Sequence, residues 1–450
     1  MKLKRLLNLS LVIAFLTTPI IGLANVQDER YLNSTDGDDS YTGENPINSP
    51  LGTGPKRTLE GAFTSFASGT TVHMAAGFYN FDQSGIGGGN DANGYILDNG
   101  AGDVANKSMT FIAESYGVND TVILNGGSLT IDAGTGTVTF QPATAGTNTI
   151  NFDPAGTSTL TLKSGILDVS GFGASGFSVD ADINNIVRTE GALIGTPSYA
   201  AADRTVTYNG SASKTAGNEL PANIQAGTLN INQISGTVTF PNALTVTTGD
   251  ILLSNTGNAT FNAAITAGAN DPTGLSIVNS STGTLAFNQL VTLMARDANF
   301  PDNVIDNQST GIIEFNNQLL FDHSASGTAG TADRTASMRN NAGGRLTAAL
   351  LNHNTGTDKS TPAVVVRIIV SVLNASNGRV DIGNTLGASE IRGNLTNDNA
   401  GTVNVNGPFT IYGTVSNYNA ASVINNNSSL EVMNNATFAV FTGNAVVGGM

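Results

Sequence analysis

Two stretches of the chain, Gly274–Leu293 (GLSIVNSSTGTLAFNQLVTL) and Asp302–Phe321 (DNVIDNQSTGIIEFNNQLLF), are copies of one pattern offset by 28 residues. Each contains a Ser-Thr-Gly tripeptide, and apolar residues occupy the second, fourth, eighth and tenth positions after its glycine. Residues two apart on a strand share a face. Each copy therefore predicts two short strands that bury one face and are separated by a polar turn.

The same spacing recurs in much of the second half of the chain. It follows four other glycines and one serine: Gly236, Gly257, Gly378, Gly401 and Ser428. A degenerate copy follows Gly344. Units of about 20 to 30 residues that carry short strands are typical of a β-solenoid, because one coil cannot bury its apolar face alone and has to stack on the next. We therefore predict an all-β fold.

The composition is compatible with such a stack. The chain has 450 residues, 53 of them glycine, with 40% hydrophobic and only 12% charged residues, and it contains no cysteine. Apolar residues in regular alternation can form a core, which argues against disorder. Without disulfides, the stacked core itself has to hold the protein together.

Residues 1–24 predict a secretory signal peptide, with three basic residues, an apolar run over Leu6–Ile21 and a small-residue cleavage region at Gly22–Ala24. An uncleaved membrane anchor is the alternative, and cleavage would leave no segment for stable membrane insertion. Cleavage also removes three positive charges from a chain of net charge −15. We expect a secreted or cell-surface protein that binds neither nucleic acid nor anionic membranes, and no polyanionic glycan unless cations bridge the contact.

The N-terminal part resembles a known family. The motifs are Asp36-Gly-Asp-Asp39, Gly43, Pro46, Thr58-Leu59 with Ala62, Gly69–Val72 and Ala76–Tyr79. They resemble the opening of secreted right-handed parallel β-helix proteins of the pectate-lyase-like superfamily. The C-terminal part, for example Asn399–Asn417 and Asn425–Val440, is similar to bacterial surface adhesins and autotransporter passenger segments. The first resemblance implies the right-handedness of the helix. It does not imply an activity, because the superfamily includes lyases, hydrolases and non-enzymatic surface proteins alike.

Together these features predict a right-handed parallel β-helix with a short N-terminal capping helix. We expect a polar loop region at 25–58, a capping helix at 59–66, irregular coils with loops at 80–224 and regular repeats at 225–450. Loops that protrude around Asn184–Asp203 are the expected place for binding. Asparagines at the corners of coils are expected to form hydrogen-bonded ladders along the axis.

Residue patterns for enzymatic chemistry are weak. The paired carboxylates and basic motifs of the hydrolase branch are missing, and Leu319–His323 only faintly resembles a pectate-lyase strand, so the end of a core strand explains it as well. Gly85–Gly102 could bind calcium or form a loop. Outward threonines, as at Thr137 and Thr139, could match ice, but Ala286 and Glu314 interrupt the row. We predict no catalytic residue, no metal and no cofactor, and leave the ligand-binding residues open.

The expected function is a non-enzymatic, adhesin-like rod that binds extracellular polysaccharide or cell-surface glycans through loops and a flat polar face. The alternative is a polysaccharide lyase or glycoside hydrolase of the pectate-lyase-like superfamily. Three or more charged side chains that converge in a groove would favour the enzyme.

Overall fold

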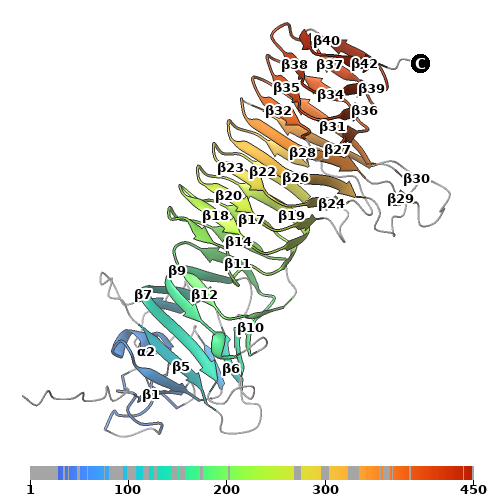
Figure 1. Cartoon of the computed structure of the whole chain (residues 1–450). Helices are drawn as coiled ribbons and strands as arrows, with labels where there is room; N and C mark the ends of the chain where they lie inside the picture. Colours follow the sequence, from blue (N-terminus) through green and yellow to red (C-terminus); the bar gives the residue numbers. More distant parts are fainter. Residues whose placement is uncertain are drawn as a thin grey trace, which may run out of the picture.

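The computed structural model is an all-β, right-handed parallel β-helix whose coils stack into a rod (Figure 1). This confirms the predicted fold class. The structure describes residues 29–33, 36–38, 40–47, 51–57, 59–75, 77–80, 95–98, 108–114, 121–125, 129–142, 149–152, 158–172, 176–200, 203–267, 275–294, 304–322, 334–341, 343–353, 356–357, 365–366, 368–384, 387–438 and 440–447.

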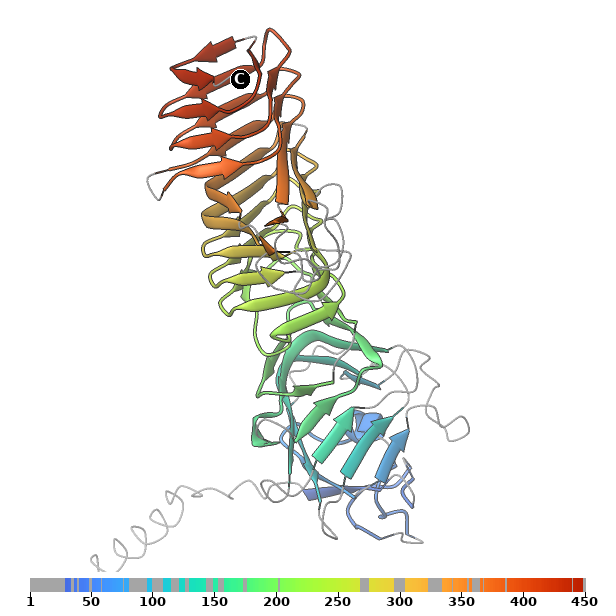
Figure 2. The ribbon, with the colours of Figure 1, turned by 90° about the vertical axis from the view of Figure 1, so that its right-hand side faces the viewer.

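Each coil contributes one strand to each of three faces, and the strands of successive coils lie side by side (Figure 2). Face 1 consists of β4 (Tyr95–Asp98), the first parts of β7 (Leu129–Pro142) and β9 (Ser158–Asp168), β11 (Ile183–Arg188), β14 (Thr205–Tyr208), β17 (Leu229–Ile231), the end of β19 (Leu244–Leu253), β22 (Leu275–Asn279), β25 (Ile305–Asn307), β27 (Arg334–Asn340), β31 (Ile368–Asn374), β34 (Leu395–Asn397), β37 (Val415–Asn417) and β40 (Ala436–Phe438).

Face 2 consists of β1 (Glu29–Leu32), β2 (Thr71–Met74), β5 (Met109–Ala113), the ends of β7 and β9, β12 (Ala192–Ile194), β15 (Lys214–Thr215), β18 (Thr237–Phe240), β20 (Asn258–Phe261), β23 (Thr284–Phe287), the first parts of β26 (Ile312–Asp322) and β28 (Arg345–His353), β32 (Arg379–Ile382), β35 (Thr402–Val405), β38 (Val423–Asn426) and β41 (Val440–Thr442).

Face 3 consists of β3 (Gly77–Asn80), β6 (Thr121–Asn125), β8 (Thr149–Phe152), β10 (Phe177–Val179), β13 (Ser198–Tyr199), β16 (Asn223–Ala226), the start of β19, β21 (Ile265–Ala267), β24 (Val291–Met294), the ends of β26 and β28, β33 (Ser389–Ile391), β36 (Phe409–Ile411), β39 (Leu430–Val432) and β42 (Ala445–Val447). A 3-10 turn, η1 (Ser170–Phe172), and an antiparallel pair, β29 (Gly356–Thr357) and β30 (Val365–Val366), lie outside the three faces.

The repeated apolar positions form columns inside the rod. Phe240, Phe261, Phe287 and Phe315 occupy one register position on face 2, and their ring centroids are 4.3, 4.9 and 5.0 Å apart along the axis. All four side chains are almost fully buried. The two-residue spacing after each glycine therefore describes core strands, as predicted.

A ladder of six buried asparagines runs along the end of face 1. Its members share one register position: Asn279, Asn307, Asn340, Asn374, Asn397 and Asn417. Each side-chain amide donates to the carbonyl four or five residues ahead and to a carbonyl of the following coil. From Asn307 to Asn397, each amide also donates to the next asparagine, at 2.8–3.1 Å. The expected ladders therefore exist, and this one lies in the interior.

The N-terminal end of the rod is covered by α2 (Leu59–Ser65), which packs against β4, the first strand of face 1 (Figure 1). Leu59, Ala62 and Phe66 are buried in the core, which is the helical spacing that the sequence indicates. The expectation of loop throughout 25–58 is wrong at β1, because Glu29–Leu32 pairs with β2 and buries Leu32. A single strand with one buried residue has too little apolar periodicity to be found from sequence.

Among the described strands, no ladder joins the end of β28 to β33 on face 3. A larger interruption, on two faces at once, lies between the coil β11–β12–β13 and the coil β14–β15–β16. Face 1 continues through the pairing of β11 with β14, but no ladder joins β12 to β15 or β13 to β16. The segment Asn184–Asp203, expected to protrude as loops, instead contains the three short strands that precede this interruption. We call this larger interruption the junction.

Candidate functional site

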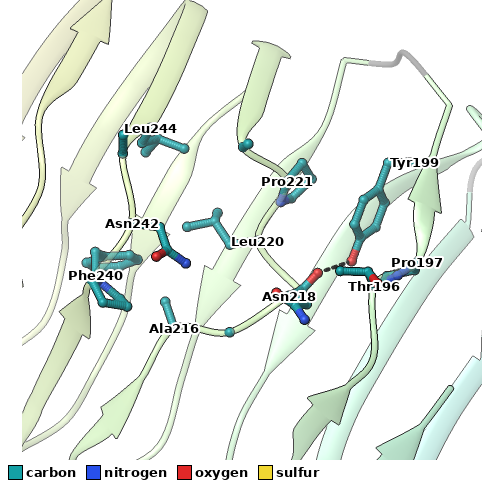
Figure 3. A pocket seen from close by; sticks show the side chains of 14 residues that line it. Thr196, Pro197, Tyr199, Ala216, Asn218, Leu220, Pro221, Phe240, Asn242 and Leu244 are labelled. Carbon is teal, nitrogen blue, oxygen red and sulfur yellow. Dashed lines mark hydrogen bonds between the residues drawn. The ribbon is translucent and has the colours of Figure 1, made fainter. Parts of the chain in front are cut away.

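A pocket of about 270 Å³ lies at the junction, on the side of face 3 (Figure 3). It is lined from the earlier coil by Thr196, Pro197 and Tyr199. The later coils contribute Ala216–Asn218, Leu220–Ala222 and Phe240–Leu244. The two coils are not joined by backbone pairing at this edge, and the pocket lies where their surfaces separate.

The local sequence explains why the ladder stops here. Pro197 and Pro221 flank the short strands β13 and β16, and a proline has no amide hydrogen to donate to a neighbouring strand. Pro241 closes the pocket from the next coil.

Side chains replace the missing backbone pairing across the junction. The Tyr199 hydroxyl donates to the Asn218 carbonyl at 2.7 Å, and the Asn218 amide donates back to the Gly195 carbonyl. Lys214 donates to the Thr189 carbonyl. These bonds hold the pocket walls together at fixed points while leaving the space between them open.

An ion pair lies in the core behind the pocket. Arg188 Nη1 contacts Glu219 Oε1 at 2.5 Å and donates to the Thr215 carbonyl at 2.7 Å, and the Tyr208 hydroxyl donates to the same carboxylate oxygen. Glu219 is completely buried. Burial is the main cause that raises the pKa of Tyr208 and of Tyr199, and the charge of Glu219 adds to it, so both hydroxyls remain hydrogen-bond donors.

The second oxygen of that carboxylate, Glu219 Oε2, is buried and has no hydrogen-bond partner. A Cβ at Gly217 would lie 2.8 Å from this oxygen, and Gly217 lines the pocket. Native proteins rarely leave such an atom unpaired.

The pocket itself is uncharged. None of the 14 lining residues is acidic or basic (Figure 3). Tyr199, Leu220 and the prolines provide apolar surface, and Arg204 lies 5.1 Å from the centre of the Tyr199 ring. The exposed amide of Asn242 makes no hydrogen bond within the described part of the chain. The arrangement can bind a small neutral molecule that has both apolar and hydroxyl groups, and it provides no acid, base or nucleophile.

A second polar cluster lies on the outer surface of face 2. Arg345 and Arg379 stack in register, and the Nε of each donates to Asp381 at 2.9 Å. Asp381 is 2% exposed and also accepts a bond from Asn404. Glu314 lies 3.9 Å from Arg345. Four charged groups thus converge, but the Asp381 carboxylate already accepts bonds from three donors and is unsuited to proton transfer.

Two histidines lie in polar clusters that shift their pKa in opposite directions. His73 contacts the carboxylates of Glu29 and Glu114; burial lowers the pKa of His73, but the bonds to the two carboxylates outweigh this and raise it overall. His353 lies 3.2 Å from Glu390 and contacts Arg392. Burial lowers the pKa of His353, and Arg392 adds to the effect.

The other residue patterns singled out in the sequence have structural roles or lie outside the described residues. In Leu319–His323, Leu319 and Phe321 are fully buried at the end of β26, and His323 lies outside the described residues. Of Gly85–Gly102 only β4 is described. Thr239 and Thr260 are followed in register by Ala286 and Glu314, so the outward row is interrupted as predicted.

Within the described ranges of the chain, no three His, Asp, Glu or Cys side chains form a group that could hold a metal ion, and no helix has the length and apolarity needed to cross a bilayer.

Tyr199 lies within Asn184–Asp203, the segment expected to bind, but the sequence singled out no individual pocket residue, and Leu220 and Asn242 lie outside that segment. A signal was available in the strand Ile183–Arg188, because alternation from Ile186 places Arg188 inward, where an arginine requires a buried partner. Comparisons with protein-family models, curated proteins and solved structures gave no match.

Proposed function

We propose that the chain is a non-enzymatic extracellular or cell-surface rod, adhesin-like in its repeats, that binds glycans or glycan-coated surfaces. One observation carries this proposal: the pocket contains no group that could transfer a proton or attack a substrate, and the charged side chains of the face-2 cluster neutralise one another. Export rests on the signal-like sequence of residues 1–24.

The repeated outer surface supports binding by many weak contacts. Exposed asparagines stack in a second, outer ladder after face 2, where Asn288 donates to Asn262 and Asn316 to Asn288 at 2.8–2.9 Å. Such ladders present amide groups at the spacing of the coils, about 4.8 Å. A flat array of this kind can engage a long polymer at several points at once.

The second candidate is a polysaccharide lyase or glycoside hydrolase. The convergence of Arg345, Arg379 and Asp381 is the observation that favours it. Against it, Asp381 already accepts three donors and has little capacity left to act as a base.

One experiment separates the two functions. Purified protein is incubated with insoluble and soluble polysaccharides, with and without calcium, and bound protein, new reducing ends and unsaturated-product absorbance are followed together. The proposal expects co-sedimentation with at least one polysaccharide and no new product. Product formation that is lost in Asp381→Asn would replace the proposal with the enzyme, and absence of binding to every polymer would refute the binding function.

A further inference from the structure

We propose that the junction pocket binds one neutral sugar ring, so that the pocket is the specific subsite of the rod. This inference rests on the proposed function and assigns it a ligand class and a place. It depends on the size of the pocket, the chemistry of its lining and the absence of charged side chains from that lining.

The size of the pocket suits a single ring. A hexose consists of six carbon–oxygen units, each of roughly the volume of a water molecule, about 30 Å³. The pocket volume of about 270 Å³ is sufficient for one such ring with its hydroxyl groups. Further sugar units of a chain would extend along the outer surface.

The lining matches the two kinds of surface that a pyranose presents. A pyranose has C–H groups on its ring faces and hydroxyl groups around its rim. The Tyr199 ring, Leu220 and Pro221 provide apolar area for the former. The exposed amides of Asn218 and Asn242 can donate to and accept from the latter (Figure 3).

The charges around the pocket exclude an ionic ligand. Arg188 is paired with Glu219, and Lys214 with Glu190. Arg204 donates to backbone carbonyls. No cationic side chain lines the pocket to compensate a uronate or sulfate, and these anions would lose hydration without gaining a partner.

The test blocks the pocket without disturbing the core. Ala243 is exposed and lines the pocket, so Ala243→Trp fills it. Ala264 is exposed at the equivalent position one coil further, because Leu244 pairs with Ile265, so Ala264→Trp is the matched control. Asn242→Ala removes the amide without adding bulk.

Binding is measured by ligand-observed NMR and calorimetry with maltose, cellobiose and β-1,4-galactobiose, with digalacturonate as the charged comparison and a proline-rich peptide as the non-sugar comparison. We expect a Kd in roughly the millimolar range for at least one neutral disaccharide, as for other ligands of this size. Ala243→Trp should weaken this binding at least about tenfold, Asn242→Ala about threefold to tenfold, and Ala264→Trp less than twofold.

The outcomes distinguish the inference from the proposed function. If the protein binds polysaccharide but Ala243→Trp and Ala264→Trp behave alike, the rod binds glycans elsewhere and the pocket assignment is wrong. A preference for digalacturonate or for the peptide also overturns it. If no polysaccharide and no sugar binds, the proposed function itself fails.

Discussion

Replacing Asn340 tests whether the buried asparagine ladder stabilises the repetitive half of the rod. In the native protein its amide donates to the Gly344 carbonyl, to Asn374 Oδ1 and to the Arg379 carbonyl at 2.9–3.1 Å, and its oxygen accepts from Asn307 at 2.8 Å. Asn340→Ala leaves Asn374 Oδ1 without a donor and removes one acceptor from Asn307. At about 1–3 kcal/mol for each buried polar group that loses its partner, we expect a loss of about 2–4 kcal/mol.

The effect should be local, because each coil of a solenoid contacts only its neighbours. Hydrogen exchange measured by mass spectrometry on peptides from β27, β28, β31 and β32 is therefore the appropriate assay. At about 1.4 kcal/mol for each factor of ten, amides that exchange through local opening of these coils should exchange about 30- to 900-fold faster. Peptides from β17 to β20 should be unchanged.

The control is Asn316→Ala in the exposed outer ladder, where one bond of 2.9 Å to Asn288 is lost. Exposed substitutions of this kind change stability by about 0.5 kcal/mol or less. Equal acceleration of exchange in the two variants, or unchanged protection in Asn340→Ala, would refute the argument that burial makes the inner ladder important.

The ladder also explains a glycine. A Cβ at Gly378 would lie 2.4 Å from Asn340 Nδ2 and 2.7 Å from Asn374 Oδ1, although Gly378 is not in a left-handed conformation. Gly378→Ala should therefore destabilise the native chain by about 1–3 kcal/mol and the Asn340→Ala chain by less. Additive effects in this double-mutant cycle would show that the glycine is required for some other reason.

Three further predictions concern the aromatic column, the histidines and the ion pair at the junction. Phe287→Ala should cost about 3–5 kcal/mol in urea denaturation and Phe287→Leu much less, because its ring stacks on both neighbours in the column. In an NMR titration of the three histidines, His73 should titrate above pH 6.5 and His353 below it. The contacts of protonated His73 should therefore stabilise the folded form at low pH, and this stabilisation is lost as the pH rises through the raised pKa of His73. At His353, protonation favours the unfolded form, so this site should destabilise the fold as the pH falls below 6.5. Titration of both at pH 6.5 would contradict the clusters described. Arg188→Met should destabilise by about 3–5 kcal/mol because it leaves Glu219 buried and unpaired, whereas the double variant with Glu219→Leu should recover most of the loss in thermal melts.

The sequence predicts the parts of the fold in which one short pattern repeats. The spacing after Gly283 and Gly311 is enough to place Phe287 and Phe315 in one interior column, because register follows from period alone when every coil has the same form. The pocket depends on different information. Arg188 and Glu219 are separated by 31 residues and belong to coils that do not share the repeat, so their pairing follows only from the three-dimensional stacking.

This difference has a physical origin that also bears on function. A coil in register with both neighbours satisfies its backbone through ladders and leaves no space between the coils. The junction pocket lies at a coil edge that is not paired, where side chains such as Tyr199 and Lys214 replace the missing bonds. If the rod binds glycans as proposed, the residues that break the repeat at the junction would give it selectivity, and the repeated asparagines would give it length and avidity. Restoring the repeat at β13 and β16 should stabilise the rod and close the pocket at the same time.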